Sequence, residues 1–175
     1  MYQVDEKDKV IELKDVPQSS VGAPLPIVLS SEYKTLLAYL LEDMTENWDG
    51  TTVRIVDFET RDEQIAIIEF NSCGDLMFGS PNDEAFEGHP LESRGLHPYG
   101  VFEIENSSWL RQLERMNSVH DRHNPENFEK YKHFVFAFHD STFECVAENF
   151  EISIHEGSLE SILPEMQKRL FNRYN

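Results

Sequence analysis

Residues 132–139 and 142–148 restrict the fold most, because large apolar side chains alternate with other residues along both segments. This alternation predicts two strands, and Asp140-Ser141 between them predicts a two-residue hairpin turn. The resulting register places six side chains on one face, in the pairs Phe138–Phe143, Phe136–Cys145 and Phe134–Ala147. A face this aromatic must be buried, and we expect it to meet the apolar stripe of the first or the last helix.

The other face of this hairpin is mixed, and it includes the two residues with catalytic potential, His139 and Glu144. The string from His139 to Glu144 contains histidine, aspartate, serine and glutamate, the residue types of hydrolase triads. However, adjacent residues of a strand point to opposite faces, and Asp140-Ser141 is explained as a turn. His139 and Glu144 remain as the catalytic candidates, although they are not directly opposed in this register.

Helical spacing of apolar residues predicts a first helix, capped by Ser30 or Ser31, that runs to about Asn47. Ser107 can cap a second helix over residues 108–118, whose inward side chains we expect to be Trp109, Leu110, Leu113 and Met116. Asn124-Pro125 predicts the start of a short third helix. Proline is tolerated in a first turn but not further inside, so Pro164 predicts that the last helix begins near Leu163.

Four further segments have the composition of strands. Three of them, Thr51–Glu59, Gln64–Phe70 and Asp75–Gly79, follow one another closely and predict an antiparallel meander. The fourth, Tyr99–Asn106, comes after a loop over residues 80–98 that contains several prolines and glycines and has no periodicity. Loops of this length are uncommon in compact domains and are often functional.

Together these elements predict an α+β fold with one mostly antiparallel sheet of about five to seven strands and helices packed on one face. We expect a single domain over residues 21–175, preceded by a poorly ordered, charged arm over residues 1–20. The strongest apolar patterns predict these core residues: Phe134, Phe136, Phe138, Phe143, Leu37, Leu40 and Ile67.

The charge balance excludes several classes of partner. The chain contains 33 acidic and 15 basic residues, which gives a net charge of −18 at pH 7. Nucleic acids and anionic membrane surfaces attract proteins through Lys and Arg, so this chain should repel both. The charged start of the chain lacks the apolar region of a signal peptide, and the two cysteines show no CxxC spacing. We therefore expect a cytoplasmic protein with reduced thiols, in which Cys145 is buried and Cys73 is exposed at a turn.

Histidines are the unusual feature of the second half, because six of the seven lie between His89 and His139. The loop string HPLESRGLHPY supplies His89, Arg94 and His97, which with Tyr99 are candidates for binding an anionic ligand. Candidate metal ligands are His120, His123 and His139, which would hold a divalent cation such as zinc. The His120-x-x-His123 pair has no second pair at zinc-finger spacing, so loop and cap histidines are the favoured interpretation.

Two hypotheses for function follow. The first is a small acidic binding protein, inhibitor-like or immunity-like, that is steered electrostatically onto a basic protein partner. The second is a metal- or histidine-dependent enzyme, or a small-ligand-binding protein, with a site formed by the 88–100 loop and the histidines of residues 120–144. The composition leaves open a homodimer formed through an exposed sheet edge.

Overall fold

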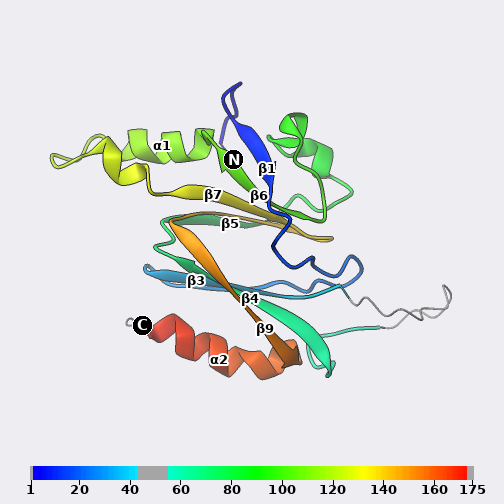
Figure 1. The fold of residues 1–175 in the computed structure, drawn as a ribbon. Helices are drawn as coiled ribbons and strands as arrows, with labels where there is room; N and C mark the ends of the chain where they lie inside the picture. The colour runs from blue at the N-terminus through cyan, green and yellow to red at the C-terminus, as the bar shows by residue number, and fades with distance from the viewer. Residues whose placement is uncertain (1, 43–54, 173–175) are drawn as a thin grey trace.

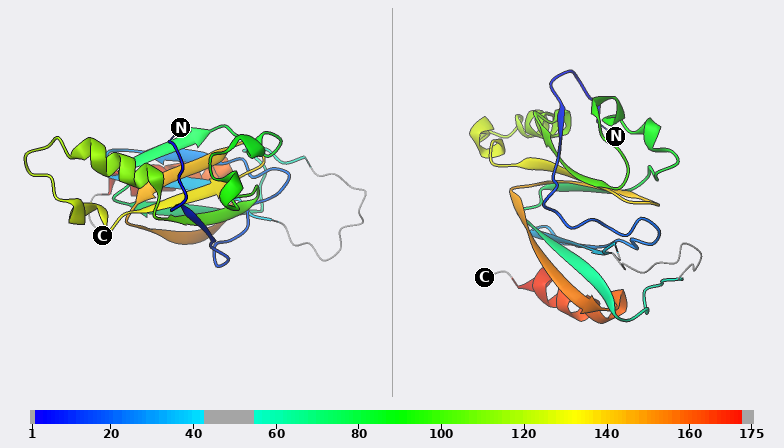
Figure 2. Two further views of the ribbon diagram at one scale, coloured as in Figure 1. Left: turned by 90° about the horizontal axis from the view of Figure 1, so that it is seen from above. Right: turned by 45° about the vertical axis from the view of Figure 1, so that its right-hand side comes forward.

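The computed structural model describes residues 2–42 and 55–172 and contains two stacked antiparallel sheets with one α-helix on each outer face (Figures 1 and 2). The first sheet has the spatial order β1 (Lys9–Glu12), β6 (Gly100–Glu105), β7 (Lys132–Ala137), β8 (Thr142–Ala147) and β5 (Asp75–Gly79). The second has the order β2 (Ile27–Ser30), β3 (Lys34–Leu40), β4 (Glu63–Asn71) and β9 (Asn149–Gly157). The helices are α1 (Ser108–Asn117) and α2 (Leu159–Phe171), with short 3₁₀ helices η1 (Phe86–Gly88), η2 (Glu92–Arg94) and η3 (Pro125–Phe128).

The fold is α+β and mostly antiparallel, as predicted, but the strands form two sheets of five and four strands instead of one. The two α-helices also lie on different sheets, with α1 outside the first and α2 outside the second (Figure 1). No helix within the described residues is both long and apolar enough to cross a lipid bilayer.

Two chain segments pass directly from one sheet to the other and join them at a corner. Residues 72–74 connect β4 to β5, and Glu148 connects β8 to β9. Backbone pairing continues across this corner, since the Glu148 N–H donates to Asn71 at 3.1 Å and the Gly74 N–H donates to Val146 at 2.8 Å. The β4–β9 and β5–β8 pairs are therefore one long bent ladder, and the predicted meander is wrong because β4 and β5 belong to different sheets.

The phenylalanine face of the β7–β8 hairpin is buried, as predicted, but it packs against the second sheet and not against a helix. Its partners there include Leu37, Tyr39 and Phe70. The pairing is shifted by two residues, so that Phe136 lies opposite Phe143. The cause is the centre of the turn: the Phe138 N–H donates to the Ser141 carbonyl at 2.9 Å, so the turn is centred on His139-Asp140, one residue earlier than predicted. A shift of two keeps every side chain on its original face, which is why the predicted face is confirmed although the register is not. All seven predicted core residues are buried.

The segment predicted as the first helix forms strand β3 over Lys34–Leu40. Both faces of β3 are covered: Leu37 and Tyr39 point into the core between the sheets, whereas Leu36, Ala38 and Leu40 point toward α2. A strand buried on both faces has a continuous apolar sequence without alternation, and such a run is easily mistaken for a buried helix. Residues 43–47 of the predicted helix lie outside the described residues, as do residues 51–54 of the strand predicted next, whose remainder is not a strand.

Both α-helices begin at serine caps. The Ser107 side chain accepts from the Leu110 N–H at 3.2 Å, which confirms the predicted start of α1. Helix α2 starts four residues earlier than predicted, because Ser158 and Ser161 form a reciprocal capping box. This cap and the burial of the α2 stripe, Leu159, Ile162 and Met166, outweigh the cost of Pro164 inside the helix.

The N-terminal segment, expected to be a poorly ordered arm, lies along the first sheet. Its β1 strand pairs with β6, and the Tyr2 ring stacks on Trp109 with centroids 5.6 Å apart. The buried Asp8 carboxylate accepts from the Ser108 N–H at 2.6 Å and so compensates the positive end of α1. The chain partners of Tyr2 and Asp8 lie about a hundred residues away, so no local pattern in residues 1–20 predicts this packing.

Candidate functional site

Histidines from two parts of the chain meet on the buried outer face of the first sheet, around the carboxylate of Glu144. This side chain is only 3% exposed, and three donors converge on it. The Tyr2 hydroxyl donates to Oε2 at 2.6 Å, His133 Nε2 lies 2.9 Å from the same oxygen, and His89 Nε2 lies 3.2 Å from Oε1. Together with Ser107, which contacts His133, we call these residues the Glu144 network.

The second nitrogen of each imidazole is also bonded, which orients both rings. His89 Nδ1 accepts from the Leu91 N–H at 3.1 Å, so its Nε2 carries the proton that is donated to Glu144. His133 Nδ1 lies 2.9 Å from the Ser107 hydroxyl. Every buried side-chain polar atom in the described residues has a partner, so the network is fully satisfied.

The electrostatics of the Glu144 network favour an ionised carboxylate. Burial by itself would raise the pKa of Glu144, but the hydrogen bonds from His133 and His89 outweigh burial and lower the pKa to about 2. Burial, reinforced by the neighbouring Glu144 charge, raises the pKa of Tyr2 far above its ordinary value. The network therefore holds a carboxylate anion and a neutral phenol across the whole physiological range of pH.

Ser107, His133 and Glu144 form a hydroxyl–imidazole–carboxylate chain, which is the order of groups in a hydrolase triad. Ser107 is 2% exposed and His133 is fully buried, so a substrate has no access to the hydroxyl. The same hydroxyl oxygen caps α1. This arrangement ties the N-terminus, the 80–98 loop, α1 and β8 together, and its evident role is structural.

His139 belongs to a different group of residues, at the exposed end of the β7–β8 hairpin. Its Nδ1 lies 3.0 Å from the Asp140 carboxylate, and its Nε2 lies 3.9 Å from Asp83. Tyr99 packs edge-on against the His139 ring and donates its hydroxyl to Asp83. We call these four residues the Tyr99 cluster. The predicted catalytic candidates His139 and Glu144 thus lie in two separate groups.

The hydrogen bonds of the Tyr99 cluster favour the protonated form of His139 and the ionised form of Asp83. The hydrogen bond to Asp140 raises the pKa of His139, and the hydrogen bond from Tyr99 lowers the pKa of Asp83. The same bond to Asp83 raises the pKa of Tyr99 to about 12. The Tyr99 backbone adopts a φ of 60°, in the left-handed region that non-glycine residues rarely occupy. Such strain is frequent at functional sites, so the Tyr99 cluster is a candidate for binding or catalysis at the surface.

The four candidate ligand residues of the loop do not surround one cavity. His89 is buried in the Glu144 network, and Tyr99 belongs to the Tyr99 cluster. Arg94 is exposed at the end of η2, and the exposed His97 packs edge-on against Phe102 with centroids 4.9 Å apart. The loop owes its shape to Phe86, Leu91 and Leu96, which are buried against the first sheet.

The candidate metal ligands His120, His123 and His139 do not come together. His120 is exposed and its Nδ1 accepts from the Arg122 N–H at 3.1 Å. His123 Nε2 lies 2.7 Å from Glu114, and its Nδ1 lies 3.1 Å from the Asn117 side chain. Within residues 2–42 and 55–172, no three His, Cys, Asp or Glu side chains are grouped so that they could hold a metal ion.

The two cysteines lie side by side in the core between the sheets. Cys145 is buried as predicted, and Cys73, which was expected to be exposed, is also buried at the corner between the sheets. The hydrogen bond with Cys145 lowers the pKa of Cys73 to about 7, whereas burial raises the pKa of Cys145. A strand change at residues 72–74, and not the turn expected there, explains the burial of Cys73.

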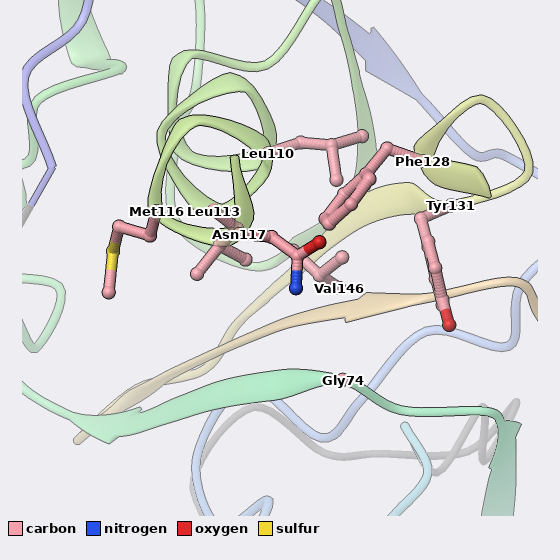
Figure 3. A pocket seen from close by; sticks show the side chains of 8 residues that line it. All are labelled: Gly74, Leu110, Leu113, Met116, Asn117, Phe128, Tyr131 and Val146. Atoms are coloured by element: carbon pink, nitrogen blue, oxygen red, sulfur yellow. The ribbon is translucent and has the colours of Figure 1, made fainter. Parts of the chain in front are cut away.

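An apolar groove of about 390 Å³ opens beside the second half of α1 (Figure 3). Helix α1 forms one wall, Phe128 of η3 and Tyr131 after it form the other, and Val146 of β8 forms part of the floor. Its lining residues are Gly74, Leu110, Leu113, Met116, Asn117, Phe128, Tyr131 and Val146. We call it the α1 groove. Met116, predicted to point inward, is 63% exposed, because α1 extends beyond the part of the sheet that covers Trp109.

The α1 groove is not predicted from the sequence, because the helical stripe of α1 has the usual spacing of core residues. The signal that could have indicated it is the pair of aromatic residues Phe128 and Tyr131 shortly after this stripe. Comparison of the chain with protein-family models, with curated proteins and with solved structures finds no match.

Proposed function

We propose that this protein is a small acidic binding module of the cytoplasm, inhibitor-like or immunity-like, whose partner is a basic protein. The observation that carries the proposal is the excess of 33 acidic over 15 basic residues. Among the described Asp and Glu side chains, only Asp8, Glu63 and Glu144 are buried. The excess negative charge is therefore on the surface, where it can accelerate association with a positively charged partner.

Ion pairs within the chain do not remove the excess of negative charge. Many cations of the described residues already contact a carboxylate, as in the pairs Lys34–Glu69, Lys130–Glu148, Lys132–Glu103, Arg111–Asp5 and Arg169–Glu165. These contacts use up positive charge that a nucleic acid or an anionic membrane would need. A basic protein surface is the partner that gains from the remaining carboxylates.

The test is to capture partners from the native cell extract at low salt, reconstitute the complex from purified components, and measure its association rate against ionic strength. We expect a stoichiometric complex with a basic protein and an association rate that falls steeply as salt is added. A specific partner that is not basic, or an association rate that is independent of salt, would overturn the proposal.

The alternative, a metal- or histidine-dependent enzyme or ligand-binding protein, has one specific observation in its favour. The exposed Tyr99 cluster joins Asp83 and Tyr99 at the ends of the long loop to His139 of the hairpin, and its backbone is strained at Tyr99. Native mass spectrometry of protein purified without chelator tests the metal form of this alternative. An added metal mass that disappears in His139→Ala would support it, and an unchanged bare mass would contradict a tightly held metal.

A further inference from the structure

The α1 groove exposes apolar surface that the fold itself does not need. Met116 is 63% exposed, and Leu110 and Leu113 of the same stripe are only half-buried. Scattered apolar residues are normal on protein surfaces, but here they line one hollow together with Phe128 and Tyr131. Aromatic and methionine side chains around a small hollow are typical of the anchor points of protein interfaces.

Three carboxylates flank the groove, beside one cation, Lys130, whose ammonium lies 5.1 Å from the centroid of the groove-lining Tyr131 ring. Asp75 follows Gly74 on its floor, and Glu126 and Glu129 lie on either side of Phe128 in its wall. All three are exposed, and none forms an ion pair with a described residue in the structure. The neighbouring Lys130 is already bound to Glu148 at 2.5 Å. The groove is thus apolar inside and negative at its rim.

We propose that the α1 groove receives one aromatic or long aliphatic side chain of the basic partner, whose flanking lysine or arginine residues face Asp75, Glu126 and Glu129. This inference rests on the proposed function and adds the position and chemistry of the contact. A volume of about 390 Å³ suits one inserted side chain and not a whole folded element. A second copy of this chain is a poorer occupant, because two molecules that each carry −18 repel one another.

The experiment compares two short fluorescent lysine-rich peptides that have identical charge and differ only in a central phenylalanine or serine. Binding is measured by anisotropy at low salt. We expect the phenylalanine peptide to bind about tenfold more tightly, because one aromatic ring leaves water. Met116→Gln, which changes no charge, should remove most of this difference. Val119→Gln is the matched control, because Val119 is 88% exposed close to the helix end but does not line the groove.

The outcomes separate the groove from the proposed function. If both peptides bind equally, the groove inference is overturned while the electrostatic proposal stands. If neither peptide binds at low salt, the proposed function fails as well. Loss of the difference in Val119→Gln as much as in Met116→Gln would also overturn the groove inference.

Methyl NMR of labelled methionines locates the contact independently. We expect the Met116 methyl signal to shift with the phenylalanine peptide and the signal of Met166, which is buried on the inner face of α2, to stay unchanged. An unshifted Met116 signal would overturn the inference. A Met116 signal that moves with protein concentration in the absence of peptide would identify a second copy as the occupant and overturn it too.

Discussion

The Glu144 network and the α1 groove lie on the same outer face of the first sheet, close to opposite ends of α1, and they differ in composition and exposure. The network is polar, sealed and fully hydrogen-bonded, whereas the groove is apolar and open. Two of the clustered histidines, His89 and His133, are therefore engaged in holding the structure together. The ordinary leucines, methionine and phenylalanine of α1 and η3 are the side chains left available to a partner.

Removing the centre of the network should have the largest effect. Glu144→Ala leaves the buried donors of Tyr2, His89 and His133 without an acceptor, so we expect a loss of about 3–5 kcal/mol of unfolding free energy. Urea denaturation measures this loss. Glu156→Ala, on the exposed side of β9, is the control and should change the free energy by less than about 0.5 kcal/mol. Equal effects in the two variants would contradict a structural role for the network.

Low pH should remove the stabilisation that the ionised Glu144 carboxylate provides. The folded-state pKa of Glu144 is lowered from 4.5 to about 2, so its contribution is present above pH 4.5 and is lost as the pH falls toward 2. The difference between the two pKa values of Glu144 corresponds to about 3 kcal/mol of unfolding free energy. Unfolding free energies measured across this range in the native protein and in Glu144→Gln provide the check, since the variant should show a smaller decrease. Parallel curves would assign the acid sensitivity to other carboxylates.

A smaller effect is expected from the hydroxyl that anchors the N-terminus. Tyr2→Phe keeps the stacking on Trp109 and removes only the hydrogen bond to Glu144. We expect a loss of about 1–2 kcal/mol, measured by urea denaturation with tryptophan fluorescence. An unchanged stability would show that the N-terminal segment adds nothing to the network in solution.

Substitutions in the α1 groove should change the unfolding free energy least. Met116→Ala removes a side chain that is mostly in water, so the unfolding free energy should change by less than about 0.5 kcal/mol. Met166→Ala is the matched comparison, because there the same side chain is fully buried on the inner face of α2 and its loss should cost about 2–5 kcal/mol of unfolding free energy. A large loss in Met116→Ala would mean that the groove is closed in solution and would remove the basis of the proposed docking.

Local signals were sufficient where the cause of a structure is local. The alternating phenylalanines of β7 and β8 predict the strands and the buried face, and the Ser107 cap predicts the start of α1. The predicted hairpin register is wrong by two residues because the turn is centred on His139-Asp140, and the turn-forming residues Asp140-Ser141 do not by themselves specify that centre. Strand β3 was predicted as a helix because both of its faces are buried, and periodicity cannot distinguish such a strand from a buried helix.

The α+β class, the aromatic core face, the caps of α1 and η3 and the excess of acidic residues follow from the amino-acid order alone, because each depends on composition or on neighbours within a few residues. The division into two sheets, the meeting of His89 and His133 at Glu144 and the exposure of Met116 arise only when the whole chain is folded. Those outcomes depend on contacts between segments far apart in the chain, such as Tyr2 with Glu144, which no spacing within one segment encodes.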